Sequence, residues 1–239
     1  MDYSDESDTV SVNNDNEMAL KSARIPVDEA FDLSSKIITI KAGPPPSTTT
    51  LKIHHAVLVR SSEYFKRVLK HEWASLRSDP DTLDMGPTHT ASDIKTYCNW
   101  LYSGTIPTRN FDDEDGAKSD YIFIDLASAY AFGEQIMDQS YKRCALETLA
   151  GVQIGAPDYP CAEAFVIVYD GTPEGSPARR MLVDMYAYGA VDSKCWASAF
   201  EALPKEALVD VLRAMVRVRR ENTGRPWREI GGYWEGERE

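Results

Sequence analysis

The chain has 239 residues, of which 43% are hydrophobic and 27% are charged, and its formal net charge is −12. This length suits one large domain, or one domain with an extension. No apolar run reaches the roughly 18 residues of a membrane span, and no secretory signal opens the sequence, so we expect an intracellular protein, cytoplasmic or nuclear, with no membrane contact. The acidic balance argues against nucleic acid as the main partner, because affinity for phosphate rises with cationic contacts.

The first predicted segment is a disordered acidic tail, residues 1–24. Its carboxylates are not accompanied by any basic residue up to position 20, and large apolar groups are few. Such a segment cannot bury enough surface to offset the entropy of ordering the chain.

A small sheet is predicted next. Ile37–Ile40 and Thr48–Ile53 are rich in β-branched residues and read as two strands. A glycine and three prolines, 43–46, separate them and predict a hairpin with a long turn. Thr82–Met85 gives a weaker third strand.

Short helices are expected between the second and third strands. The ranges are His55–Arg60 and Ser62–His71, and Ser61 or Ser62 can cap the second by accepting a backbone N–H bond. The stretch Trp73–Pro80 is polar and typical of a turn.

Longer helices follow. Thr90-Ala91-Ser92-Asp93 resembles a capping box, and the helix that it opens should end at Gly104. After a loop at Thr105–Lys118, the pattern predicts helices over Ser119–Ile136 and from about Met137 to Ala150. The apolar side of the first is expected to hold Tyr121, Ile122, Leu126, Ala129 and Tyr130.

The last third of the sequence also predicts helices. Ser176 reads as an N-cap and Pro177 as the first residue of a helix that continues to Ala187. A second helix is predicted over Pro204–Arg220, and residues 221–239 should be frayed and polar. Four residues of this second helix are expected to point inward: Leu208, Val211, Leu212 and Met215.

Three sequence motifs occur in order after the first strand. They are H-x-x-V-L at His54–Leu58, R-S-S-x-Y-F at Arg60–Phe65 and W-L-Y-S-G at Trp100–Gly104. Together they resemble a BTB/POZ domain. The resemblance implies an α+β fold, a small sheet capped by helical hairpins, over residues 30–150. The helices predicted after that range make residues 151–220 an α-helical C-terminal extension, and residues 221–239 a frayed tail.

The extension carries a further resemblance. The pattern Y-x-x-T-P-E-G-S-P-x-R-R-x-L-V-D-x-Y, Tyr169–Tyr186, is similar to a segment that follows the BTB domain in many filamentous-fungal proteins of unassigned role. It implies a fungal source.

A BTB/POZ domain has no active site, so the resemblance implies a binding protein with a protein partner, and no catalytic residue, cofactor, metal or small-molecule substrate. The contact residues that it implies are Val57, Leu58, Arg60 and Tyr64, although Leu58 and Tyr64 suit a core role better. The family usually has Asp where this chain has Lys36, which puts an inherited corepressor pocket in doubt.

Three functions remain open from the sequence. The first is a scaffold that homodimerises; many dimers of the family exchange a strand before the domain, here Arg24–Leu33. The second is a substrate adaptor for a cullin-type ubiquitin ligase, in which residues 151–220 would be a diverged version of the helical pair that such adaptors usually add to the domain. The third is a nucleic-acid-associated transcriptional regulator that uses the arginines near the C-terminus. These are Arg213, Arg217, Arg219, Arg220, Arg225 and Arg228.

Other chemistries fit the sequence less well. The four cysteines form no C-x-x-C pair and read as reduced thiols, mostly buried. Gly171–Gly175 lacks the lysine of a Walker loop, and the acidic loop Asp112–Gly116 fails the calcium-loop spacing. All four histidines lie in the first 90 residues, and no G-x-S-x-G is present.

Overall fold

The computed structural model of the protein describes residues 25–87, 89–109, 118–155, 158–221 and 230–233. The chain divides into two units, Met1–Phe31 and Asp32–Glu239. In the first unit, the described residues form a single turn of 3-10 helix, η1, at Val27–Glu29. The predicted acidic tail, residues 1–24, lies outside the described residues.

The second unit begins with a three-stranded sheet. Its strands are β1 at Ile37–Ala42, β2 at Thr49–His54 and β3 at Thr82–Asp84, in the order β2-β1-β3. β1 pairs antiparallel with β2 and parallel with β3, and Ile40 lies opposite Leu51 on one side and Leu83 on the other. The predicted hairpin and third strand are therefore confirmed.

The sheet buries one face. Along β1, Ile38, Ile40 and Ala42 are buried, while Ile37 and Lys41 point to solvent. This alternation follows from the two-residue period of a strand, which sends neighbouring side chains to opposite faces.

Three short helices connect β2 to β3: α1 at His55–Leu58, α2 at Glu63–Val68 and α3 at His71–Ala74. Ser62 caps α2, because its Oγ accepts a hydrogen bond of 3.1 Å from the backbone N–H of Phe65. The α3 segment overlaps a stretch that the sequence predicted as a turn, and it forms one helical turn instead.

Helix α4, Ala91–Ser103, has the ends that the sequence predicted. The Thr90 side chain accepts a bond from the Asp93 N–H, the Asp93 carboxylate accepts one from the Thr90 N–H, and Gly104 ends the helix with φ of +70°. Glycine adopts this left-handed conformation without a Cβ clash.

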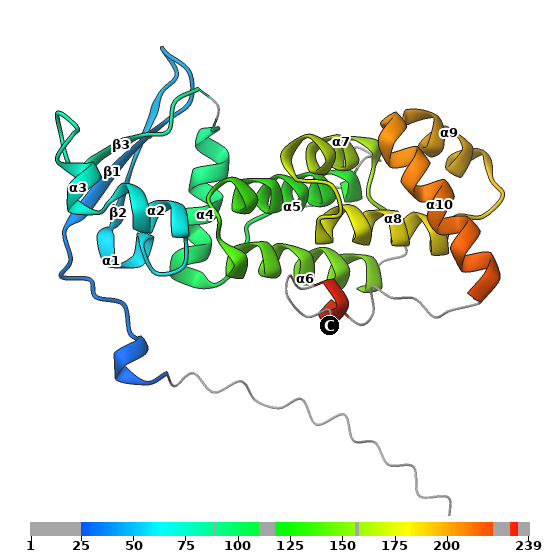
Figure 1. Ribbon diagram of the computed structural model, residues 1–239, viewed down its shortest axis with the longest axis horizontal. Helices are drawn as coiled ribbons and strands as arrows, with labels where there is room; N and C mark the ends of the chain where they lie inside the picture. Colours follow the sequence, from blue (N-terminus) through cyan, green and yellow to red (C-terminus); the bar gives the residue numbers. More distant parts are fainter. Residues whose placement is uncertain (1–24, 88, 110–117, 156–157, 222–229, 234–239) are drawn as a thin grey trace, which may run out of the picture. The chain divides into compact units, whose positions relative to one another are not determined.

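Helices α5, Lys118–Gln135, and α6, Gln139–Gly155, form a hairpin beside α4 (Figure 1). Since α5 packs against α4, α6 and α7, it is buried on more than one side. One expected inward residue is corrected: Tyr121 is exposed, and the Arg109 guanidinium stacks on its ring at 4.3 Å. The buried residues of α5 are Ile122, Phe123, Leu126, Ala127, Ala129, Tyr130, Ala131 and Phe132.

The chain continues with α7 at Ala162–Gly171, α8 at Pro177–Gly189, α9 at Lys194–Ala202, α10 at Lys205–Glu221 and η3 at Ile230–Tyr233. Within the second unit, the sheet lies toward one end of the α5–α6 hairpin, α7 and α8 lie beside the hairpin, and α9 and α10 lie toward its other end (Figure 1). The predicted N-cap of α8 is confirmed, since Ser176 Oγ accepts a bond of 3.3 Å from the Arg179 N–H.

Two expectations about the C-terminal part are corrected: Leu212 does not point inward, although Val211 is buried as expected, and residues 230–233 are not frayed. Helix α10 packs against α8 and buries Ala207, Val211 and Ala214, whereas Leu212 is 53% exposed. Small side chains let two helices approach closely, so the alanines determine the buried stripe rather than the larger leucine. The segment Ile230–Tyr233, expected to be frayed, forms η3 and buries Tyr233.

The structure thus belongs to the α+β class, with a small sheet and many helices. None of the helices in the described part of the chain is long and apolar enough to cross a membrane.

Candidate interaction surface

Two of the four predicted contact residues belong to the core. Val57 and Leu58 are 1% and 0% exposed, and their helix α1 packs against α4 and β2. Their expected role as contact residues is corrected, because a partner cannot touch a side chain that is already covered on all sides.

The other two predicted contact residues reach the surface. Arg60 is exposed at the end of α1, and Tyr64 is half-buried on α2. The Tyr64 hydroxyl lies 3.8 Å from Met85 Sδ, and its ring meets the edge of Phe65 at 5.2 Å. Burial raises the pKa of Tyr64, and the nearby charge of Arg77 offsets part of this rise.

The sequence did not single out the two most exposed apolar residues of this region. Trp73 on α3 is 60% exposed, and Leu76, two residues after that helix, is 76% exposed. Arg77 holds their loop, since its guanidinium donates bonds of 2.8 Å to the backbone carbonyls of Val68 and Pro80. Both residues lie in a polar stretch of the sequence. Hydrophobic periodicity identifies the apolar face of a helix or strand, but it does not identify an isolated exposed apolar residue.

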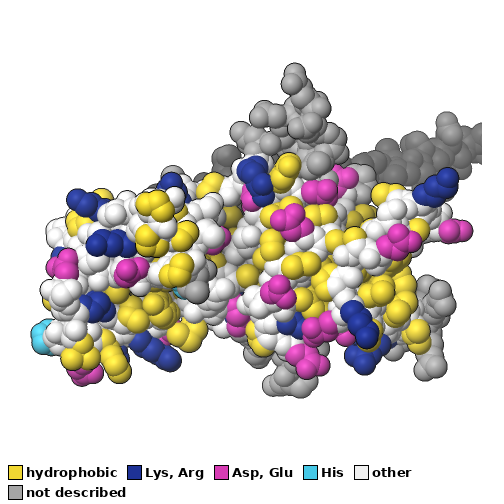
Figure 2. All heavy atoms as spheres, turned by 90° about the horizontal axis from the view of Figure 1, so that it is seen from above, with side chains coloured by type: hydrophobic (Ala, Val, Ile, Leu, Met, Phe, Trp, Pro, Cys, Tyr) yellow, Lys and Arg dark blue, Asp and Glu magenta, His cyan; other side chains and the backbone are white. Residues whose placement is uncertain are grey.

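A second group of exposed apolar residues precedes and opens β1. We call Ile25, Val27, Leu33 and Ile37 the N-terminal apolar segment. Val27 is 92% exposed, Ile25 and Leu33 are each 61% exposed, and Ile37 is 42% exposed. Figure 2 displays one face of the molecule, on which hydrophobic side chains lie between charged ones.

A buried hydrogen-bond network fixes α2 relative to the helices behind it. The Asp138 carboxylate, fully buried at the turn between α5 and α6, accepts bonds from Ser61 Oγ at 2.5 Å and from the Tyr97 hydroxyl at 2.7 Å. It also accepts a bond of 3.0 Å from the Tyr141 N–H at the first turn of α6. Three donors satisfy a carboxylate that would otherwise be costly to bury.

Lys36, which stands where the resemblance implies an aspartate, pairs with Asp81 at 2.5 Å. Both side chains are about half exposed, so the pair contributes little to stability.

His54, at the end of β2, lies 2.7 Å from the Tyr102 hydroxyl through its Nδ1.

The C-terminal arginines are partly engaged within the chain. Arg217 donates to Asp184 at 3.1 Å, and Arg213 lies 3.4 Å from Asp210. The side chains of Arg219 and Arg220, and all of Arg225 and Arg228, lie outside the described residues, as does the acidic loop Asp112–Gly116.

The cysteines are free thiols, three of them partly buried and Cys195 exposed. Burial raises the pKa of Cys98 to about 11. Across the described ranges, no group of three or more His, Cys, Asp or Glu side chains could hold a metal ion.

A comparison of the chain with protein-family models gave no match, and a comparison with curated proteins gave none.

Proposed function

We propose that the chain is a BTB/POZ-type protein–protein interaction module that forms a homodimer. The order of elements supports this: a strand hairpin, short helices, a third strand, then α4 and the α5–α6 hairpin. The three motifs that resemble the family fall on the β2–α1 junction, on the turn before α2 with its first three residues, and on the end of α4.

The N-terminal apolar segment is the observation that carries the proposal. Four large apolar side chains lie exposed within thirteen residues, Ile25 to Ile37. Burial of such a side chain contributes about 1.5–3 kcal/mol, so a second copy that covers them would gain substantially. In the family that the chain resembles, many dimers exchange a strand in this position. Arg60 and Tyr64, which reach the surface of the second unit, are of residue types that are enriched at interfaces.

A cullin-type ubiquitin-ligase adaptor is the second candidate function. It is favoured by one observation: α7 packs directly against α5, and α8 against α7, so the extension forms a helical pair on the domain itself. Adaptors of this type usually carry such a pair beside the BTB domain.

Light scattering behind a sizing column, on the full chain at two concentrations, tests the first proposal. We expect a mass of twice the 26.7 kDa monomer. The double variant Ile25→Asp, Val27→Asp should give the monomer, because two charges would be buried in the contact.

Val191→Asp is the matched control, since Val191 is also an exposed valine but lies between α8 and α9. A monomer at both concentrations would overturn the homodimer. A dimer that survives the double substitution would overturn the role given to the segment. In the same assay, a stable complex between a monomeric chain and a cullin N-terminal region would favour the adaptor.

A further inference from the structure

A cleft of about 1030 Å³ lies between α8, α10 and η3. This is at the upper end of the size range of small-ligand pockets. Its floor and walls include tyrosine and aliphatic side chains from three elements, among them Val183, Ile230 and Tyr233. The cleft shares no residue with the segment proposed for dimerisation and does not depend on that proposal.

The cleft is lined by one more arginine than carboxylate, although the protein as a whole is acidic. Four arginines and three carboxylates line it, whereas the whole chain carries a net charge of −12. A concave site of the opposite sign to the rest of the molecule concentrates ligands of the matching charge. Because the excess is a single charge, an anionic ligand requires a guanidinium group that has no partner within the protein.

Two of the three carboxylates are already engaged by tyrosines. Asp184 accepts a bond of 2.8 Å from the Tyr233 hydroxyl in addition to its contact with Arg217. Asp210 accepts a bond of 3.0 Å from the Tyr169 hydroxyl in addition to its contact with Arg213. Their negative charge is thus shared among several donors.

Arg179 is satisfied by the protein itself. Its guanidinium donates to Thr172 Oγ1 at 3.1 Å, to the Tyr169 and Thr172 carbonyls, and to Glu206 at 2.8 Å. These bonds fix the C-terminal end of α7. We therefore do not assign Arg179 to ligand binding.

Arg180 differs from the other three arginines. Its Nε is buried and has no hydrogen-bond partner among the residues that the structure describes. Its guanidinium lies 5.8 Å from the centre of the Tyr233 ring and forms no ion pair within the same ranges. Because a guanidinium is always charged, a partly buried one without an ion pair is costly, and an oxyanion bound in the cleft that Arg180 lines would compensate its charge.

We propose that this cleft binds a phosphate or carboxylate group on a ligand with an aromatic or aliphatic body, and that Arg180 is the main partner of the anion. Arg213 and Arg217, held loosely at the mouth, would add attraction. Tyr233, Ile230 and Val183 would contact the apolar body. A planar guanidinium matches an oxyanion through two parallel hydrogen bonds, which an ammonium group does not reproduce.

Calorimetric titration of the full chain tests the site, with phenyl phosphate, benzoate and inorganic phosphate as probes. We expect saturable binding of at least one aromatic anion, and weaker binding of inorganic phosphate because it lacks the apolar body. Preference between the first two probes assigns the natural anion as phosphate or carboxylate. No saturable binding of any probe would overturn the proposal.

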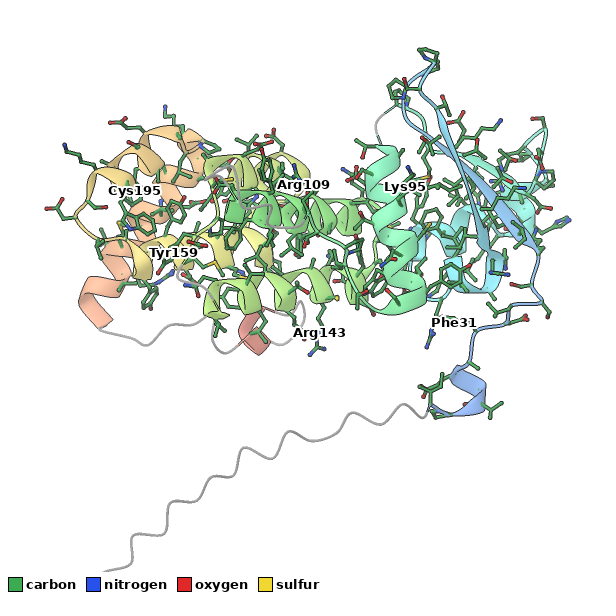
Figure 3. All side chains as sticks on the ribbon, turned by 180° about the vertical axis from the view of Figure 1, so that it is seen from behind. Phe31, Lys95, Arg109, Arg143, Tyr159 and Cys195 are labelled. Carbon is green, nitrogen blue, oxygen red and sulfur yellow. The ribbon has the colours of Figure 1, made fainter. Side chains whose placement is uncertain are left out.

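The variant Arg180→Gln should weaken binding of the aromatic anion roughly tenfold or more, since a charge-assisted bond is lost. Arg180→Lys should bind with an intermediate affinity. Arg143→Gln is the matched control, because Arg143 projects outward from α6, where it pairs with Glu147 at 3.3 Å (Figure 3).

A purely structural role for Arg180 predicts a different pattern. Removal of a structural arginine would lower the melting temperature of the free protein, whereas removal of an unpaired cation should leave it unchanged or raise it. Equal affinity in wild type and Arg180→Gln, or a large loss of melting temperature in that variant, would overturn the assignment.

Discussion

The Tyr97 hydroxyl donates a hydrogen bond of 2.7 Å to the fully buried carboxylate of Asp138, and this bond joins α4 to the start of α6. The same carboxylate oxygen accepts the bond from Ser61, just before α2. One side chain at a three-residue turn therefore joins α4, the first turn of α6 and the residue just before the cap of α2.

Asp138→Ala should lower the free energy of unfolding by about 2–4 kcal/mol, because it leaves buried donors without an acceptor and removes the N-terminal cap of α6. Tyr97→Phe removes a single hydrogen bond and should cost about 1 kcal/mol. Urea unfolding followed by circular dichroism measures both. If the alanine variant were as stable as wild type, the network would not have the role assigned to it.

Buried tyrosines predict a loss of stability in alkali. Burial raises the pKa of Tyr97, Tyr141, Tyr186 and Tyr233 above the ordinary value of a phenol. A raised pKa in the folded state means that the neutral phenol is favoured there. The contribution of these neutral phenols to the free energy of unfolding is therefore complete below the unfolded pKa of about 10. It is lost as the pH rises above that value.

We therefore expect the free energy of unfolding to be insensitive to these groups at neutral pH and to fall above a pH of about 10. The ultraviolet absorbance of phenolate should show a class of tyrosines that ionises together with unfolding. Reversible ionisation of every tyrosine in the folded protein, at the pH of a free phenol, would contradict this expectation.

Gly171→Ala should destabilise the contact between α5 and α7. A Cβ at position 171 would lie 2.6 Å from the Cβ of Ala131, and neither group can rotate away. The helices must separate, at a cost of about 1–3 kcal/mol.

Gly151→Ala is the matched control for that substitution. Position 151 lies within α6, and nothing lies within 4 Å of a Cβ built there. Alanine should stabilise the helix by about 0.5–1 kcal/mol. Thermal unfolding gives the melting temperature of both variants. Shifts in the same direction would show that the close contact between α5 and α7 at Gly171 does not determine the effect of the substitution.

Arg179→Lys should cost about 2–4 kcal/mol despite the conserved charge, because an ammonium group cannot reach the carbonyls, the hydroxyl and the carboxylate that the buried guanidinium bridges. Arg213→Lys, at a largely exposed side chain with a long ion pair, should change stability by well under about 1 kcal/mol. Chemical denaturation measures the free energy of unfolding of both variants. Similar small effects would mean that Arg179 does not stabilise the packing of α7, α8 and α10.

The sequence by itself determined the features that depend on neighbouring backbone atoms. The cap of α2 at Ser62, the capping box at Thr90, the end of α4 at Gly104 and the start of α8 at Ser176 all lie where the pattern predicted them. Each is a hydrogen bond or a backbone angle set within four residues, so a short window of sequence contains its cause. The α+β class also follows from these local patterns.

Only the tertiary structure decided which side chains meet. It placed Val57 and Leu58 in the core, left Tyr121 and Leu212 at the surface, and brought Tyr233 back to Asp184, 49 residues earlier in the chain. It also left Arg180 with its Nε unpartnered beside a tyrosine ring, while Arg179, the next residue, is saturated. Two adjacent arginines look alike in the sequence, but neighbours on a helix point about 100° apart. Their surroundings are therefore set by segments that are distant along the chain and close in space.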